Sequence, residues 1–193
     1  MRRPRIALAA TLALTLALGS VHAAATPRHP GYLTAQPFLD LAGPDDEVTE
    51  VSVGRELLTA ICKGMDDPDA ARLLCNIVAV HAVVIGLSGD SVSARLGRAR
   101  TLVGNTTERL LDSGWETLVR VRKESSTVSV LTKATGSAGK VEGLAVLVVD
   151  TGSDGPEIVF ANIAGTIEMS QLRRLSAGLD LPGLDQLEDL DKD

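Results

Sequence analysis

The stretch from Trp115 to Ile167, WETLVRVRKESSTVSVLTKATGSAGKVEGLAVLVVDTGSDGPEIVFANIAGTI, decides the fold. Apolar and polar residues alternate in four runs, which is the period of β-strands. The four runs are Glu116 to Lys123, Thr127 to Lys133, Lys140 to Asp150 and Glu157 to Ile163. The connections between them are too short for a crossover helix, so consecutive strands must be antiparallel neighbours. The stretch therefore predicts a four-stranded antiparallel meander.

Upstream of the meander, the pattern predicts two more strands and three helical segments. The expected strands are Val48 to Val53 and the strongly apolar run Asn76 to Leu87, and the expected helices are Arg55 to Lys63, Ala70 to Leu74 and Val92 to Leu110. The run Asn76 to Leu87 is rich in β-branched residues, which is typical of a central strand covered on both faces. The helix from Val92 has apolar residues every three or four positions, and Ser91 can cap its start.

These elements predict one α+β domain over residues 47–187. We expect a single, mostly antiparallel sheet of about five to six strands, ending in the four-strand meander, with helices packed on one main face. A further helix, Ser170 to Leu179, is expected to close the domain, and residues 188–193 form an acidic tail.

The first 23 residues have the three parts of a secretory signal peptide. Basic Arg2, Arg3 and Arg5 precede the apolar run Ile6 to Leu18, and small residues at Val21 and Ala23 form a cleavage site. Residues 24–46, rich in Pro, Gly and Ala, are expected to be a flexible leader. No cysteine stands directly after the cleavage site to carry a lipid. The sequence therefore predicts a periplasmic or secreted protein with no stable membrane anchor after signal cleavage.

Charge and composition exclude several classes of partner. Loss of the signal removes three arginines, which leaves 16 Lys+Arg against 25 Asp+Glu and a formal charge of 16 − 25 = −9. An acidic chain without a dominant basic cluster is a poor nucleic-acid binder. Only four aromatic residues are present, namely one Trp, one Tyr and two Phe, so an aromatic ligand groove is hard to build.

The residue types needed for catalysis are scarce. Of three histidines, His22 leaves with the signal, His29 lies in the leader, and His81 falls within the apolar strand. A nucleophile–histidine arrangement or a His and Cys metal site would have to recruit a side chain from the core. We therefore expect no catalytic residues, no metal and no cofactor, and a protein that is not an enzyme.

Two cysteines, Cys62 and Cys75, are candidates for a disulfide. An oxidising compartment favours a bridge between them, and their spacing is not that of a CxxC redox site. The alternative is two buried thiols, and the sequence leaves both open.

Three pieces of the sequence resemble the domain of unknown function 4252 family of exported bacterial proteins. They are Trp115 to Arg122, the glycine-bounded strand Leu144 to Val149, and Phe160 to Ile167 ahead of a leucine-rich helix. The resemblance covers roughly Val48 to Leu187. It implies export and a small α+β domain without an established activity, so it assigns no catalytic residue.

Strand alternation also predicts an interaction face. The valines at 119, 121, 128, 130, 146 and 148, with Leu144, Val159, Ala161 and Ile163, are expected to form the main core under the helices. The opposite face would then carry an apolar strip of Leu131, Leu147 and Phe160, bordered by Arg120, Arg122 and Lys133. Such a strip indicates a partner surface or self-association. The alternative is that the leader or the acidic tail folds back and covers it.

The function expected from the sequence is therefore a non-enzymatic envelope module that binds an unknown protein partner or assembles with itself. One alternative is a small periplasmic hydrolase that uses surface carboxylates. Another is a regulatory protein that meets a membrane partner through its acidic tail.

Overall fold

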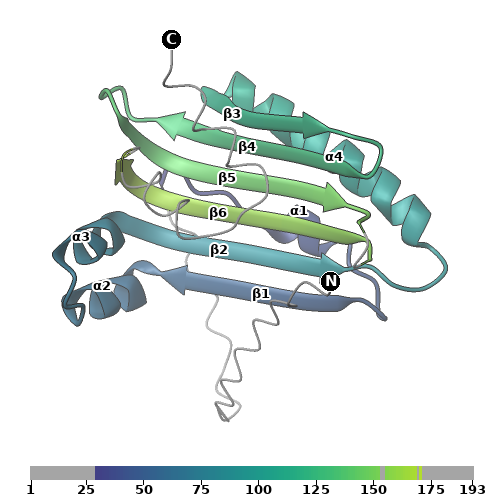
Figure 1. Cartoon of the computed structure of the whole chain (residues 1–193), viewed down its shortest axis with the longest axis horizontal. Coiled ribbons are helices and arrows are strands. Elements are labelled where there is room, and N and C mark those ends of the chain that lie inside the picture. Colours follow the sequence, from purple (N-terminus) through teal and green to yellow (C-terminus); the bar gives the residue numbers. More distant parts are fainter. Residues whose placement is uncertain (1–28, 153–154, 169, 171–193) are drawn as a thin grey trace, which may run out of the picture.

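The computed structural model describes residues 29–152, 155–168 and 170 of the chain (Figure 1). The expected signal peptide, the acidic tail and all of the expected C-terminal helix except Ser170 lie outside these residues. In chain order the elements are α1 (Gln36–Leu39), β1 (Glu47–Gly54), α2 (Arg55–Lys63), α3 (Pro68–Asn76), β2 (Ile77–Gly86), α4 (Val92–Asp112), β3 (Trp115–Arg122), β4 (Ser126–Ala134), β5 (Lys140–Asp150) and β6 (Glu157–Glu168).

The six strands form one antiparallel sheet in the order β1-β2-β6-β5-β4-β3. The predicted α+β class and the meander from β3 to β6 are confirmed. β2 was expected at the centre with both faces covered, but it lies second from the edge, between β1 and β6. Burial alternates along β2, so only one of its faces is deeply buried. Its continuous apolar run reflects a sheet that is apolar on both sides.

Helices α1 and α4 cover one face of the sheet, behind the strands in the view of Figure 1. This helix-covered face holds the largest hydrophobic cluster, where Val103 and Leu110 of α4 pack on strand residues such as Leu131 and Leu147. The 21 residues of α4 make it the longest helix of the described part. Its predicted cap is not formed, because the side chain of Ser91 makes no capping hydrogen bond.

Helices α2 and α3 pack against each other at one end of the sheet (Figure 1). The disulfide Cys62–Cys75 joins them, with the two Cα atoms 5.6 Å apart. Leu58 and Leu73 of this pair belong to a second hydrophobic cluster, which also contacts Val80, Leu144 and Ile163 of the sheet. The structure thus contains the bridge, rather than the two thiols, that the sequence left open.

The segment 29–46, expected to be a flexible leader, is packed against the helix-covered face. Phe38 of α1 is 1% exposed, and its ring centroid lies 5.0 Å from that of Phe160. Asn162, also 1% exposed, accepts a hydrogen bond from the Leu33 backbone N–H (2.9 Å) and donates one to the Gly31 carbonyl (2.9 Å). The prediction of a flexible leader was therefore wrong over these residues. A buried aromatic contact and a satisfied amide hold the segment in place.

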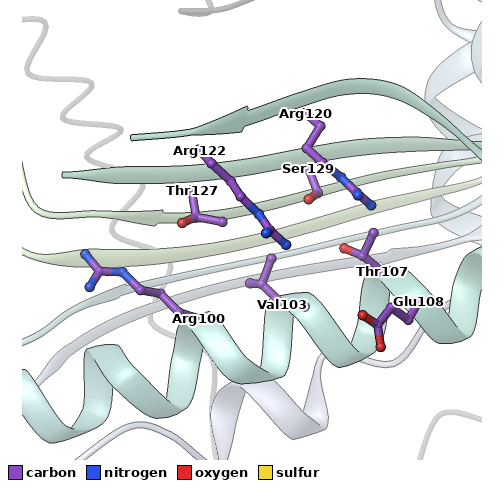
Figure 2. Close-up of a pocket in the computed structure, with 9 residues that line it drawn as sticks. Arg100, Val103, Thr107, Glu108, Arg120, Arg122, Thr127 and Ser129 are labelled. Atoms are coloured by element: carbon purple, nitrogen blue, oxygen red, sulfur yellow. The ribbon is translucent and has the colours of Figure 1, made fainter. Parts of the chain in front are cut away.

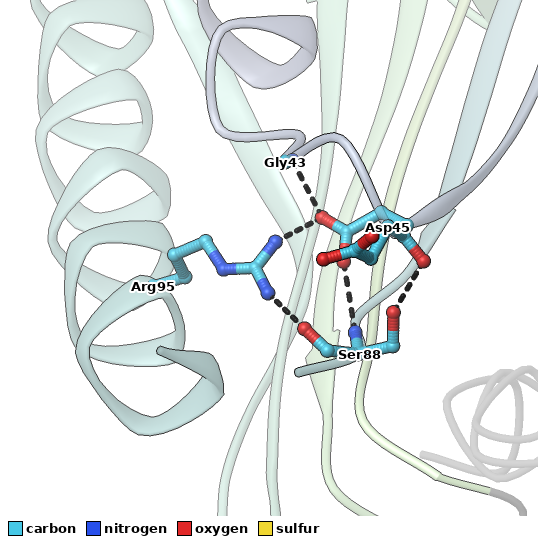
Figure 3. Close-up of polar contacts among 5 residues, drawn as sticks. Gly43, Asp45, Ser88 and Arg95 are labelled. Carbon is cyan, nitrogen blue, oxygen red and sulfur yellow. Dashed lines mark hydrogen bonds and ion pairs between the residues drawn. The ribbon is translucent and has the colours of Figure 1, made fainter. Parts of the chain in front are cut away.

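A buried ion pair fastens the end of this segment to α4 (Figure 3). The Asp46 side chain is 0% exposed and pairs with the Arg95 guanidinium. It also accepts hydrogen bonds from the backbone N–H groups of Gly43 (2.7 Å) and Ser88 (2.8 Å). Desolvation acts to raise the pKa of the Asp46 carboxyl, but these hydrogen bonds and the Arg95 charge outweigh it. The pKa of Asp46 therefore lies below its ordinary value.

Candidate functional site

The predicted apolar strip is part of the core. Leu131 and Leu147 are 0% exposed and Phe160 is 1% exposed, because α4 and the segment 29–46 cover them. The prediction of a free partner surface through these three residues was wrong. The alternative, that the leader folds back and covers the strip, is correct in part, because the segment 29–46 covers the strip together with α4.

The two faces of the sheet were exchanged in the prediction because both are apolar. A period of two separates the faces but does not say which one the helices cover. Side-chain size decides the matter, since the helix-covered face holds the bulky Trp115, Leu147 and Phe160 while the other face is mostly valine and alanine. Large side chains fill the space between a sheet and a helix layer more completely.

The basic residues of the predicted interaction face lie on the helix-covered side. Arg120 and Arg122 are exposed at the edge strand β3 and line a cleft between β3, β4 and α4 (Figure 2). Lys133 instead donates a hydrogen bond to the carbonyl of Ser113 at the end of α4. The six residues of the predicted interaction face therefore have three different environments. Three lie in the core, two line the cleft, and Lys133 is bonded to the C-terminal end of α4.

The opposite side of the sheet, which we call the open face, carries three rows of mostly apolar side chains across the strands. Residues paired directly across antiparallel strands point to the same side. Read from β1 towards β3, the rows are Thr49, Val84, Val159, Val148, Val128 and Val121; Val51, Ala82, Ala161, Val146, Val130 and Val119; and Val53, Val80, Ile163, Leu144, Thr132 and Glu116. Glu116, on the edge strand β3, is the one charged residue of these rows.

Among the described residues, only α2 and α3 pack on the open face, at the end marked by Val80, Leu144 and Ile163. Val51 is 46% exposed and Val84 is 36% exposed. Val146, Val159 and most other members of the rows are half-buried, while Val119 and Val130 are buried. A sheet face that meets only water is normally polar, so this composition indicates a contact with another apolar surface.

Comparison with known families matches residues 43–175 to a domain of unknown function (DUF4252). The chain belongs to the DUF4252 family. Comparison with curated proteins and with solved structures finds no match. The matched DUF4252 residues contain every strand, the open face and both cysteines, and begin after α1. The part of the segment 29–46 that holds Phe38 therefore lies ahead of the family match, although it completes the core.

The one histidine inside the matched DUF4252 residues has a structural setting. His81 is 9% exposed on the helix-covered side of β2, with Nε2 3.0 Å from Oε1 of Glu50 on β1. Its ring lies edge-on to Phe160, with centroids 6.0 Å apart. Within the described ranges, no cluster of three His, Cys, Asp or Glu side chains could hold a metal ion, and no helix is long and apolar enough to cross a bilayer.

Proposed function

We propose that this DUF4252 protein is an exported, non-enzymatic module that assembles with a second copy of itself through the open face. The observation that carries the proposal is the set of three mostly apolar rows across all six strands, in which Glu116 on the edge strand β3 is the one charged residue. Two such faces, related by a twofold axis, would form a sandwich with the sheets about 10 Å apart. The helix layers would then lie on the outside.

The size of the open face allows a small dimer interface. Six strands about 4.8 Å apart, each with about eight residues at a rise of about 3.3 Å, give one side of the sheet an area of roughly 29 by 26 Å, or about 750 Å², of which α2 and α3 cover one end. Standard protein interfaces bury about 600 to 1,000 Å² per partner, and the uncovered part corresponds to the lower end of that range. Because the one charge in the rows, Glu116, lies on the edge strand β3, association would desolvate no ion at the centre of the interface.

The C-terminal helix expected at Ser170 to Leu179 offers a smaller cover. A helix of ten residues is about 15 Å long and about 10 Å wide, which corresponds to roughly a fifth of the face. Even with α2 and α3 at one end, a large apolar area would remain. A second copy matches the area and the chemistry better.

The disulfide and the environment of His81 support the other two parts of the proposal, namely export and a non-enzymatic role. The disulfide between α2 and α3 suits an oxidising compartment, in agreement with the signal peptide expected at Met1 to Ala23. Both cysteines are oxidised in this bridge, and His81 lies between Glu50 and Phe160 in the sheet. Cysteine and histidine are residue types that often take part in catalysis, and in this fold they have structural roles.

The test is the mass in solution of the exported chain and of two variants, Val146→Glu and Ala161→Glu, in the central row of the open face. Light scattering after size exclusion should give twice the chain mass for the wild type. Each variant should be monomeric, because a dimer would bury its new carboxylate. Leu111→Glu, at a residue of α4 that is 38% exposed, is the control and should remain dimeric.

Two results would contradict self-assembly through this face. The first is a wild type that stays monomeric at about 100 μM while Val146→Glu loses much of its thermal stability, which would mean that the chain covers its own open face. The second is a dimer that survives both substitutions, which would place the interface elsewhere.

A further inference from the structure

A basic cleft lies between α4 and the strands β3 and β4, on the side of the molecule away from the open face (Figure 2). We call it the arginine cleft. Arg120 and Arg122 reach from β3 towards α4, and Arg100 lines the cleft from the helix. On β4, Ser129 lies directly opposite Arg120 and Thr127 opposite Arg122. The cleft thus combines three guanidinium groups with hydroxyl groups from neighbouring strands.

The positive charges of the arginine cleft are not neutralised by the described residues. Neither Arg120 nor Arg122 forms a hydrogen bond or an ion pair there, and Arg100 donates only to the backbone carbonyl of Glu124 (3.1 Å). The whole chain has a formal charge of −6. A concentration of unpaired arginines on an acidic protein indicates a local site for an anion.

A buried hydroxyl group in the same cleft lacks a partner. Thr107 is 3% exposed, and its Oγ1 forms no hydrogen bond with the described residues. Helical threonines commonly bond the carbonyl four residues earlier, as Thr101 does to Gly97 (3.0 Å) on the same helix. The hydroxyl oxygen of Thr107 lies on the side of α4 that faces the strands, below Arg120 (Figure 2). Buried hydroxyls are nearly always satisfied, so this one points to a ligand group.

The space in the cleft suits a small group. Its volume is about 140 Å³, which equals four or five water molecules at about 30 Å³ each. Gly104 forms part of the lining, and a Cβ placed on it would have no atom within 4 Å. A glycine inside a helix weakens the helix relative to alanine. A side chain at this position would occupy part of the open space beside the cleft lining.

We propose that the arginine cleft binds a tetrahedral oxyanion, namely a phosphoryl or sulfuryl group. Arg120 and Arg122 donate N–H bonds from one side, and the hydroxyl groups of Thr107 and Ser129 donate to the remaining oxygens. Arginine is suited to this task because its planar fork of donors can bond two oxygens of one anion. Glu108, eight residues from Arg100 and thus about 12 Å along α4, places a negative charge at the other end of the cleft. A single compact anion between these ends fits better than an extended polyanion.

The experiment is a titration of the exported chain with sodium phosphate and with sodium sulfate at constant ionic strength, followed by calorimetry and by thermal melting. Binding to the folded state should raise the melting temperature in a saturable way, more than acetate or chloride does. Arg120→Gln and Arg122→Gln should each weaken the affinity about tenfold, because each removes charged hydrogen bonds. Arg109→Gln, an exposed arginine of α4 outside the cleft, is the matched control and should bind normally.

Three further variants keep the test independent of folding. Thr107→Val has nearly the same shape and should weaken binding severalfold while leaving stability equal or higher, since it removes a hydroxyl without a partner. Gly104→Ala should weaken binding and raise stability, whereas Gly97→Ala, also with open space at its Cβ, should raise stability only. Glu108→Gln should strengthen binding severalfold.

The phosphoryl group can belong to a soluble ion or to a lipid headgroup. Co-sedimentation with phosphatidylcholine vesicles, with and without about 20% phosphatidylglycerol, distinguishes them: binding only to the anionic vesicles, lost in Arg122→Gln, identifies a headgroup, and binding of free phosphate alone identifies a soluble ligand. The proposal is overturned if phosphate and sulfate act no more strongly than acetate, or if the arginine and Thr107 variants bind as the wild type does.

Discussion

Asp46 is a single residue that joins three parts of the chain, because its carboxylate contacts Gly43, Ser88 and Arg95. Replacing it by Asn should cost about 3 kcal/mol at pH 7, since the buried Arg95 guanidinium, 6% exposed, would lose its charged partner. Urea unfolding of the two proteins measures this difference.

The pH dependence of Asp46 follows from its lowered pKa. A carboxyl whose pKa is lower in the folded state stabilises the fold above its unfolded pKa of about 3.9, and that stability is lost as the pH falls through the folded value. The difference between wild type and Asp46→Asn should therefore be constant near neutrality and shrink below about pH 4. An unchanged difference at pH 2.5 would show that charge is not the cause.

Neighbouring residues on β5 test the assignment of the two faces. Leu147 is 0% exposed under α4, whereas Val146 is half-buried on the open face. Leu147→Ala should cost about 2–5 kcal/mol because it leaves a cavity. Val146→Ala should cost about 1 kcal/mol or less in the monomer. Equal losses by chemical denaturation would contradict the assignment.

At the scale of an element, the disulfide holds α2 and α3 together at the end of the sheet. A bridge that closes a loop of about 13 residues stabilises a protein by about 3 kcal/mol. Cys75 is exposed, so a reductant can reach it without global unfolding. The double variant Cys62→Ser and Cys75→Ser should therefore lose about 3 kcal/mol, and reduced wild type should melt together with it. A smaller loss on reduction than in the variant would assign part of the effect to packing of the buried Cys62.

Much of the secondary structure follows from the sequence. The expected bounds of α2 and β5 agree with the structure, and those of the other meander strands differ at their ends, most of all in β6, which extends to Glu168. Helix α1 was missed because four residues with an internal proline carry no periodic signal. Its position depends on the contact between Phe38 and Phe160, which are distant in the sequence.

At the scale of the whole molecule, the layers could not be predicted in full. Arg120 and Arg122 were recognised as neighbours on one face of a strand, but Arg100 and Thr107 join them only because α4 packs over β3 and β4. The packing of a helix on a sheet is a tertiary property that strand alternation does not contain. A signal was present in Gly104, an unexplained glycine inside a helical stripe.

Ionic strength should act in opposite directions on the two proposed interactions. Two copies of the exported chain, each with a formal charge of 16 − 25 = −9, repel one another, so raising sodium chloride from about 50 to about 500 mM should tighten the dimer. Binding of an oxyanion to arginines should weaken over the same range. Sedimentation velocity and calorimetry at the two salt concentrations check these trends, and a dimer that dissociates at high salt would indicate a polar interface.

The most direct test of an interface on the open face is a dilution series followed by methyl NMR of valine-labelled protein. The methyl resonances of Val84, Val146 and Val159 on the open face should shift with concentration along a dimer binding curve. Those of Val83 and Val149, buried on the helix-covered face at 1% and 0% exposure, should remain constant. Shifts confined to the open-face valines are the predicted result. Spectra that do not change with dilution, or that change only elsewhere, would contradict self-assembly through this face.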